Sequence, residues 1–552
     1  MASQISRAAG AAALTCGGTN IASYLLMRAQ RLISYSGPRL GKLTRRLCAV
    51  LIPGLLLAGC FRPTANYDPW QVPQGLTGSQ TPTGISTQTQ ILTLPRNTIT
   101  PAPAGPTPTP NQPALLPTLR AQTEEYTVVS GDSLERIALR HQVSVGQILS
   151  ANPDLKDPNL IEPGQKLTIP PASANELATD FKIIPDAELF YSPSAVGFDT
   201  LSVAAQFSGK LYRYSETLED DTTLSGAEIV QRVADEFSVN PRLLLAVLEY
   251  RSGWLTSAGK TGVSEDYPLG LKNANRKGLY KQLSWAANEM TRGYTLWDNA
   301  AVAVWILADG SVMRANAAIN GATAGMQYFF GLLLGKEEWK QAVSPEGFYA
   351  DYERLFGFPF AFSIEPLVPE NLVQPELELP FRPGDTWYFT GGPHVGWGTG
   401  SAFAGIDFAP PGEEFGCYES QTPVTAAADG LVVRSGNGVV VQDLDGDGIE
   451  QTGWSLLYLH VASEGRAAEG TYLRQGDVLG YPSCEGGYST GTHLHLARRY
   501  NGVWIPADGS LPFVLSGWTS EGAGFEYDGY LIKNGHTVEA FNGRADFNAI
   551  GR

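Results

Sequence analysis

The spacing of hydrophobic and polar positions changes three times along the 552 residues. Residues 60–122 have few apolar positions and are rich in Pro, Thr, Gln and Gly, which predicts a disordered tether. Residues 123–172 mix short strand and helix patterns, residues 180–375 follow helical spacing, and residues 380–552 hold short apolar or alternating runs divided by Gly and Asp. Because one core rarely grows beyond about 250 residues, we expect a multidomain α+β protein.

The first patterned region, residues 123–172, predicts a small module. The run YTVV begins a strand, Asp132 and Glu135 have the spacing of a capping box, and a second helix is expected to start near Ser144. The ending KLTI closes a two-stranded sheet. With GDSL, ANP and PGQKLTIP, residues 126–170 resemble a LysM module of βααβ form. The resemblance implies binding of N-acetylglucosamine-containing glycans such as peptidoglycan; the alternative is a small domain that has lost sugar binding.

The second region, residues 180–375, is predicted to be mostly α-helical. Ser225 has the position of a helix cap, and the pair Asn240-Pro241 opens another helix through LLLAVLEYR. The stretch VNPRLLLAVLEYRSGW is similar to the active-site helix of lysozyme-like transglycosylases, in which a catalytic glutamate directly precedes a serine. Arg251 occupies that place here, and Glu249 would point to a different helix face. We therefore expect a lysozyme-like domain that is noncatalytic.

The third region, residues 380–552, predicts an antiparallel β-sheet domain and contains the candidate chemistry. Five of the six histidines lie after residue 390. His493 and His495 in THLHLA are two positions apart, so on a strand they project from the same face. Paired imidazoles on a strand suggest a metal, and zinc in hydrolytic sites takes three protein ligands and one water.

Three segments of this region resemble the lysostaphin or LytM-like zinc endopeptidases, in particular the β-lytic and staphylolytic branch. The resemblance spans residues 380–510 and implies the duplicated hybrid motif of that family as the fold. The commoner family pattern has a zinc-binding histidine four residues before the aspartate ligand, but Phe403 stands there, before Asp407. In the β-lytic branch the histidine lies thirteen residues before the aspartate, which is the position of His394 in GGPHVGWGTGSAFAGID.

The other two segments, GWSLLYLH and CEGGYSTGTHLHL, complete the pattern of the branch. The resemblance implies one zinc ion per chain, bound by His394, Asp407 and His495, with His460 and His493 as catalytic histidines. Such a zinc ion lowers the pKa of bound water and polarises a peptide carbonyl, while the two histidines orient water and move protons. Several glycines of the segments are expected either to let an extended peptide approach or to make turns: Gly405, Gly486, Gly487 and Gly491.

The segment KLTRRLCAVLIPGLLLAGC predicts that residues 1–59 are an export signal, because a basic start precedes a short apolar run. Leu57-Ala58-Gly59-Cys60 resembles a bacterial lipobox, which implies lipidation of Cys60 and attachment to a membrane at the cell surface. The alternative is an uncleaved anchor or a coincidental apolar run. The net charge is −16, and −23 without residues 1–59, which carry seven Lys or Arg and no acidic residue. Such an acidic chain does not favour nucleic acid.

Two further features carry open alternatives. If Cys16 and Cys48 leave with the signal and Cys60 carries lipid, only Cys417 and Cys484 remain, as one disulfide or as two buried thiols. The loop DLDGDGIE, with aspartates at 443, 445 and 447, is reminiscent of a calcium loop, but its twelfth position is Trp454 and a hairpin turn is favoured.

Taken with the resemblances, these features predict an exported, lipid-anchored and monomeric zinc endopeptidase. LysM would hold the enzyme against peptidoglycan, where it would cut peptide stems or crossbridges. The alternative is a noncatalytic peptidoglycan-binding scaffold, or an activator of other wall hydrolases, which Arg251 favours because it marks one enzyme-like domain as already inactive.

Overall fold

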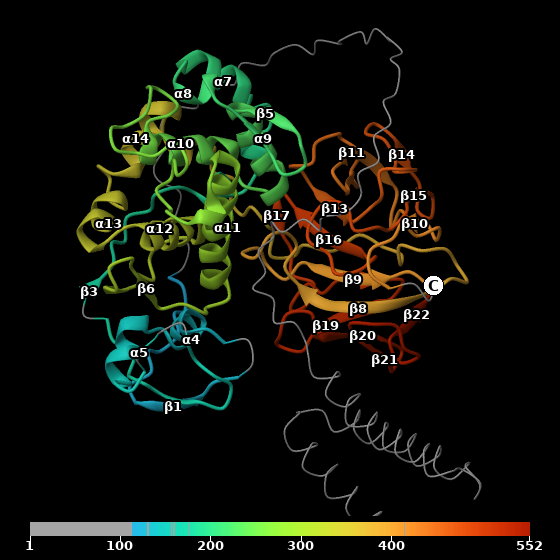
Figure 1. The fold of residues 1–552 in the computed structure, drawn as a ribbon. Helices are drawn as coiled ribbons and strands as arrows, with labels where there is room; N and C mark the ends of the chain where they lie inside the picture. The colour runs from blue at the N-terminus through green and yellow to red at the C-terminus, as the bar shows by residue number, and fades with distance from the viewer. Residues whose placement is uncertain (1–112, 130–131, 156, 158–159, 175, 413–414) are drawn as a thin grey trace, which may run out of the picture. The chain divides into compact units, whose positions relative to one another are not determined.

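The computed structural model describes residues 113–552, except residues 130–131, 156, 158–159, 175 and 413–414. The predicted signal (1–59), Cys60 and the predicted tether up to residue 112 lie outside the described residues. Figure 1 shows, in chain order, a small mixed module, a helical domain and a domain of strands. Among the described residues, no helix combines the length and the apolar character needed to cross a bilayer.

The small module has the predicted βααβ order. Its elements are β1 (Glu124–Thr127), α4 (Leu134–His141), α5 (Val145–Ala151) and β2 (Lys166–Ile169). The two strands pair antiparallel. As expected, α5 starts next to Ser144. It begins with a capping box that was not predicted, in which the Ser144 hydroxyl accepts from the Gln147 N–H and the Gln147 side chain accepts from the Ser144 N–H. Apolar side chains of both helices and β2 are buried together and form the core of the module.

The start of α4 differs from the expected capping box. Ser133 caps this helix, because its hydroxyl accepts a hydrogen bond from the N–H of Arg136. Asp132 does not: its carboxylate accepts from the Tyr126 hydroxyl at 2.7 Å and from the Val129 N–H at 2.9 Å. Since those two donors occupy the carboxylate, Asp132 connects the strand to the loop before the helix, and the adjacent serine caps α4.

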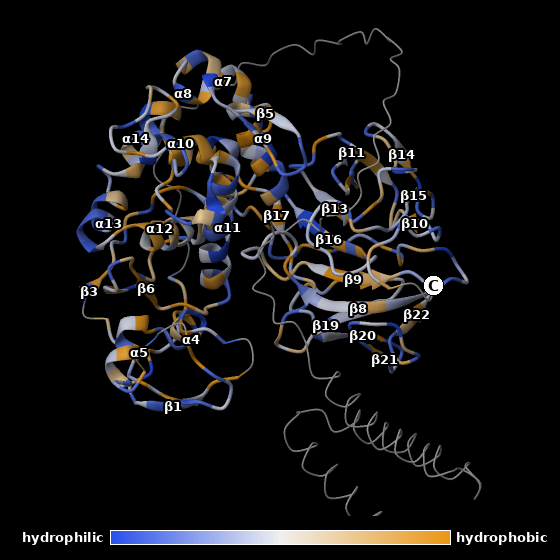
Figure 2. Cartoon of the chain, in the orientation of Figure 1, coloured by the Kyte–Doolittle hydropathy of each residue, from blue (hydrophilic) through white to orange (hydrophobic). Residues whose placement is uncertain are grey.

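The helical domain confirms the helical spacing of residues 180–375. Ser225 caps α9 in a capping box with Glu228, and Asn240 caps α10 with Pro241 in the first helical turn. Figure 2 shows hydrophobic and hydrophilic segments alternating along α9, as expected for a helix with one buried side, whereas α10 is buried over most of its length. The elements are β3 (Glu176–Leu177), α6 (Asp186–Leu189), η1 (Pro193–Ala195), α7 (Thr200–Phe207), α8 (Lys210–Arg213), β4 (Ser215–Thr217), β5 (Thr223–Ser225), α9 (Gly226–Phe237), α10 (Pro241–Ser252), η2 (Ala274–Arg276), α11 (Leu279–Asp298), β6 (Val304–Ile306), β7 (Val312–Arg314), α12 (Gly321–Leu333), α13 (Lys336–Ala342), α14 (Phe348–Phe356) and η3 (Pro359–Phe362).

The C-terminal end of α10 carries Arg251 and Glu249, the two residues on which the noncatalytic expectation rests. Arg251 stands where a catalytic glutamate is expected, and its Nε donates to the carbonyl of Leu269 at 2.9 Å. The nearby Glu249 is buried, and its carboxylate accepts from the N–H groups of Leu255 and Thr256 and from the Thr256 hydroxyl. Both groups therefore hold the chain that follows α10, and neither is placed as a free proton donor.

The C-terminal domain is built on a nine-stranded antiparallel sheet, as the alternating runs predict. The strand order is β14-β11-β12-β13-β16-β9-β8-β22, with β17 paired to β16. A four-stranded sheet, β18-β19-β20-β21, and the pair β10-β15 complete the domain. The elements are β8 (Thr386–His394), β9 (Gly405–Ala409), β10 (Val424–Thr425), β11 (Gly430–Gly436), β12 (Val439–Asp443), β13 (Trp454–Leu459), β14 (Tyr472–Leu473), β15 (Val478–Gly480), β16 (Leu494–Tyr500), β17 (Val503–Trp504), β18 (Val514–Leu515), β19 (Trp518–Gly522), β20 (Gly529–Lys533), β21 (His536–Glu539) and β22 (Ala549–Gly551).

The two faces of the central strands have different contents. On β16, Leu494 and Leu496 belong to the main core of the domain, together with Phe408 of β9. The intervening positions face the other way, because successive side chains of a strand alternate. His495 and Asp407 therefore lie on the face opposite the main core, where buried polar groups can gather without interrupting it.

Candidate metal centre

Three neighbouring strands bring His394, Asp407 and His495 together. His495 on β16 is directly paired with Asp407 on β9, and β9 is paired on its other side with β8, which ends at His394. All three residues are buried. The pairing of the three strands, with an irregular register at the end of β8, therefore brings side chains from distant parts of the sequence to one point. The expected ligand set is present as a group that could hold a metal ion.

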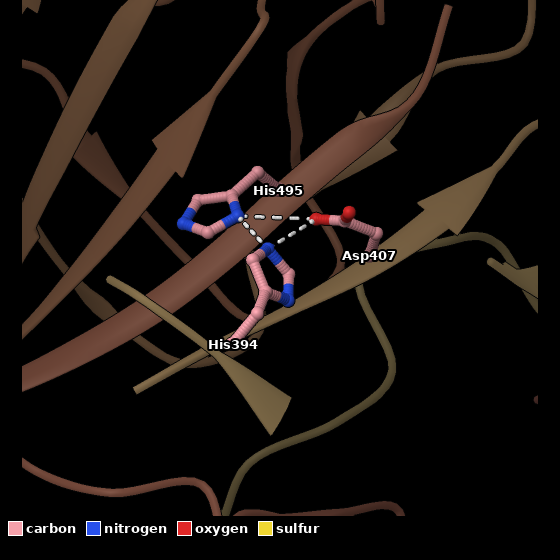
Figure 3. A group of neighbouring side chains, drawn as sticks. All are labelled: His394, Asp407 and His495. Atoms are coloured by element: carbon pink, nitrogen blue, oxygen red, sulfur yellow. Dashed lines mark hydrogen bonds and ion pairs between the residues drawn. The ribbon is translucent and has the colours of Figure 1, made fainter. Parts of the chain in front are cut away.

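The donor atoms of these residues are close enough to share one ion (Figure 3). His394 Nε2 lies 2.9 Å from His495 Nδ1 and 3.2 Å from Asp407 Oδ1, and His495 Nδ1 lies 3.0 Å from the same carboxylate oxygen. Tetrahedral zinc with bonds of about 2.0–2.1 Å spaces its ligand atoms by about 3.3 Å. The observed spacing is close to this value, so the three residues fit zinc.

The other nitrogen of each ligand ring is occupied by the backbone. His394 Nδ1 donates to the carbonyl of Gly392 at 2.8 Å, and His495 Nε2 donates to the carbonyl of Gly396 at 3.1 Å. When the two rings are neutral, Nε2 of His394 and Nδ1 of His495 therefore carry lone pairs that face each other. A cation between these nitrogens and the Asp407 carboxylate would be bound by all three groups. The hydrogen bonds fix the tautomers that metal binding requires.

The electrostatics of the centre favour an ionised aspartate. Burial would raise the pKa of Asp407, but His394 and His493 outweigh it and hold this pKa well below its ordinary value. Burial would lower the pKa of His394, but the Asp407 carboxylate raises it overall. Burial dominates at His495 and lowers its pKa. The centre therefore pairs a carboxylate with two imidazoles, one of which is kept neutral by burial.

His460 and His493 form a second imidazole pair beside the three ligands. Their ring centroids are 4.5 Å apart, and His493 Nε2 lies 3.7 Å from Asp407 Oδ2. Each Nδ1 donates to a backbone carbonyl at 2.8 Å, that of Glu485 for His460 and that of Gly491 for His493. Burial and the neighbouring His493 lower the pKa of His460 well below its ordinary value. His460 is therefore neutral near pH 7, with its Nε2 lone pair available.

The backbone at His460 is held in an uncommon conformation. Its φ is +66°, in the left-handed region that costs a non-glycine residue energy. The Ser483 N–H donates to the His460 carbonyl, and Glu485 accepts from the ring. These contacts on both sides keep the histidine in place despite the unfavourable dihedral angle.

The structure gives two of the highlighted glycines a role other than peptide access. A Cβ at Gly405 would lie 2.2 Å from Cε1 of His495, so the missing side chain makes room for the ligand ring. Gly486 has φ +84°, and a Cβ there would lie 2.2 Å from the carbonyl oxygen of Asn437. At Gly487 and Gly491 a Cβ would make ordinary contacts, at 3.8 Å with Cε1 of His460 and at 3.5 Å with the carbonyl oxygen of Gly416 respectively.

Replacing Gly405 with alanine is expected to weaken zinc binding about tenfold or more, because the new methyl group displaces the His495 ring from the shared centre. Gly436→Ala is the matched control, since a Cβ at this strand position would meet nothing within 4 Å. Competition titration with a zinc chelator measures both affinities. Equal affinities in the two variants would show that the ring tolerates the methyl group.

Tyr527 is a neighbour of the centre that the sequence analysis missed. Its ring stacks on His394 with centroids 4.2 Å apart and planes inclined by 22°. Its carbonyl accepts from the Gly392 N–H, and its own N–H donates to Pro393. Tyr527 lies in the loop between β19 and β20, and no motif in GAGFEYDGY marks it. Only the packing of the second sheet against β8 brings it to the ligand.

The structure resolves one of the two open alternatives of the sequence analysis, that of the cysteines. Cys417 and Cys484 form a disulfide, with Cα atoms 5.6 Å apart. The carboxylates of Asp443, Asp445 and Asp447 also lie close enough together to hold an ion. They accept hydrogen bonds from N–H groups of their own loop, as the favoured hairpin turn requires.

Two imidazoles and one carboxylate around a single point, beside a second pair of imidazoles, define a metal-dependent hydrolase. Comparison with known protein families agrees. Residues 404–506 match peptidase family M23, residues 126–170 match the LysM domain, and residues 182–367 match the LasA N-terminal domain. The chain is thus an enzyme whose C-terminal domain matches the zinc metalloendopeptidases of family M23, and it also has a LysM domain and a helical LasA N-terminal domain. His394 precedes the matched M23 segment, and the structure places it beside Asp407 and His495, as the sequence analysis expected.

The chain is similar to several characterised proteins. It is 27% identical to protease LasA of Pseudomonas aeruginosa (strain UCBPP-PA14) over 320 residues, which cover 53% of this chain and 71% of the relative. It is 27% identical to the beta-lytic metalloendopeptidase of Achromobacter lyticus over 172 residues, or 29% of this chain and 43% of the relative. A solved structure of the M23 metalloprotease pseudoalterin has a TM-score of 0.26 and 22% identity, covering 33% of this chain and 99% of that one.

Proposed function

We propose that the protein is a cell-envelope endopeptidase that hydrolyses peptide bonds of peptidoglycan, in its stems or its crossbridges. The observation that carries this proposal is the presence, on one chain, of an M23 metal centre and a LysM domain. LysM binding to glycan raises the local concentration of the attached peptides, which favours cleavage of a weakly bound polymer. The alternative of a noncatalytic scaffold is disfavoured because all three ligand side chains are present and converge.

His394, Asp407 and His495 would hold one zinc ion. When bound, zinc supplies a Lewis acid for a peptide carbonyl and lowers the pKa of a water molecule from 15.7 toward about 7. Asp407 retains its negative charge because of the surrounding imidazoles. Gly392 and Gly396 keep the two ligand rings in the orientation that presents Nε2 of His394 and Nδ1 of His495.

His460 and His493 would be the catalytic histidines. Because each Nδ1–H is bound to a carbonyl, each ring has its Nε2 left to accept or deliver a proton. In a neutral ring this Nε2 accepts the proton of the attacking water, and once protonated it donates to the developing oxyanion or to the leaving amine. The pair therefore supplies the proton transfers that hydrolysis of an amide requires.

The rest of the chain would deliver this site to the cell wall. We propose export through residues 1–59, lipidation at Cys60, and a tether over residues 60–122. The proposed domain boundaries are 123–172 for LysM, 180–375 for the helical domain and 380–552 for the peptidase. The helical domain is proposed to be a noncatalytic, lysozyme-like part of a monomeric protein, in keeping with the positions of Arg251 and Glu249.

Digestion of purified wall sacculi tests the proposed function. Incubation with the zinc-loaded protein is expected to release soluble fragments with new amine ends, which mass spectrometry locates within the stem or crossbridge peptides. Chelation followed by zinc restoration provides the control for metal dependence. Intact sacculi after incubation with fully zinc-loaded protein would contradict a peptidoglycan substrate.

A further inference from the structure

The disulfide between Cys417 and Cys484 joins two loops, and each loop holds one member of the His460–His493 pair. Cys484 lies between Ser483 and Glu485, and both neighbours bond His460. The N–H and the hydroxyl of Ser483 donate to the His460 carbonyl, and the carbonyl of Glu485 accepts from its ring at 2.8 Å. One cysteine is therefore part of the short segment that holds His460 from two sides.

The other cysteine, Cys417, belongs to a segment that is hydrogen-bonded to Thr492, the residue before His493. Cys417 lies between Gly416 and Tyr418, and both bond Thr492, which directly precedes His493. The Thr492 N–H donates to the Gly416 carbonyl at 2.9 Å, and the Tyr418 N–H donates to the Thr492 hydroxyl at 2.8 Å. The disulfide thus connects the segment that is hydrogen-bonded to His460 with the segment that is hydrogen-bonded to Thr492, the residue before His493.

The three ligands do not depend on these loops. His394, Asp407 and His495 lie on the paired strands β8, β9 and β16. The carbonyls that accept from the two ligand rings belong to Gly392 and Gly396, which lie in neither disulfide-linked loop. Removing the bond would therefore loosen the second imidazole pair and leave the metal ligands in place.

We propose that Cys417 and Cys484 are positioning residues for hydrolysis, whose disulfide fixes His460 relative to His493. The inference rests on the proposed catalytic role of these two histidines. Cys417 is exposed and Cys484 is partly exposed, so solution reductants reach the bond. The disulfide is the covalent part of this connection, and a backbone bridge between Ser483 and His493 joins the same two segments; together they hold the two rings 4.5 Å apart.

Reduction of the folded enzyme tests the proposal directly. A phosphine is used, because dithiols bind zinc; phosphine, water and the disulfide give two thiols and a phosphine oxide. The substrate is a soluble peptide that the oxidised wild-type enzyme cleaves. We expect kcat to fall by about 10- to 100-fold, because small misplacements of catalytic groups cost rates of this order. KM and the zinc content per chain should stay unchanged, and re-oxidation with glutathione disulfide should restore kcat.

The double variant Cys417→Ser with Cys484→Ser shows whether this bond is responsible. It should have the low kcat of the reduced wild type, and the phosphine should not change it further, which excludes effects at Cys16, Cys48 or Cys60. In a His460→Ala background, reduction should have little additional effect, because the positioned group is already absent.

The outcomes separate this inference from the proposed function. If oxidised wild-type enzyme cleaves no peptide, the proposed function fails. If it cleaves and reduction leaves kcat unchanged, the positioning role is wrong. If reduction releases zinc together with activity, the disulfide supports the metal centre instead, and the inference is equally overturned. A full effect of reduction in the His460→Ala background would also contradict it.

Discussion

His495→Ala is expected to abolish both zinc binding and peptide-bond cleavage. The substitution removes Nδ1, which lies within 3.0 Å of the other two donors, and leaves only one imidazole and one carboxylate. Without zinc, no group lowers the pKa of the attacking water from 15.7, so we expect the cleavage rate to fall by roughly four orders of magnitude or more. Zinc per chain, measured by mass spectrometry of metals, and peptide release from sacculi check the two effects.

His536→Ala provides the matched control for this loss. His536 is an exposed histidine at the start of β21 and lies outside the candidate centre, so the variant should keep zinc and activity. Binding to sacculi should be the same in both variants, because the LysM module is unchanged. A His495→Ala protein that retains stoichiometric zinc and cleaves peptide would refute the assignment of the metal ligands.

His460→Ala and His493→Ala are expected to separate catalysis from metal binding. Each variant removes one of the two imidazoles beside the ligands, and we expect kcat to fall by about 10²- to 10⁴-fold, the usual contribution of a general acid or base. Zinc per chain should remain at the wild-type value, since neither ring is within the ligand group. Steady-state kinetics on a soluble peptide and metal analysis of the same samples measure both quantities.

The two variants must also be folded for this comparison to be valid. The temperature of thermal unfolding, with His536→Ala as reference, checks this for each protein. Loss of zinc from either variant would show that its histidine is a ligand. Full activity with full zinc content would show that it takes no part in proton transfer.

The ligand set could be predicted because the sequence segments resemble the β-lytic branch, whose ligand pattern was transferred to this chain residue by residue. The two-residue separation of His493 and His495 and the thirteen-residue separation of His394 and Asp407 are visible in the sequence. The pairing of His495 with Asp407 across β16 and β9 is a tertiary property, and no local pattern determines it. Side chains far apart in sequence meet only because the sheet brings their strands together.

The residues that were missed or misread depend on packing. Tyr527 stacks on His394 from a separate sheet, and Gly405 proves to accommodate a ligand ring. Asp132 was expected to cap α4 on spacing alone, but the Tyr126 hydroxyl competes for its carboxylate and Ser133 takes the cap. Each of these contacts involves a partner that the metal-binding or capping pattern does not include.

For the helical domain, the sequence predicted the secondary structure but not the domain family. Its caps and apolar spacing correctly indicated helices such as α9 and α10. Its family could not be read from one helix, and residues 182–367 match the LasA N-terminal domain. The likeness to lysozyme therefore stays a prediction, since helical spacing indicates secondary structure and does not define which domain carries it.

The pairing of His495 with Asp407 has a consequence for how the enzyme matures. A strand that slips by one residue turns every side chain to the opposite face of the sheet. A β16 shifted in this way would place the His495 side chain in the hydrophobic core, although its backbone hydrogen bonds to β9 could still form. Metal binding is thus expected only in chains whose strands β8, β9 and β16 are correctly paired, so a chain with a shifted β16 would have no activity.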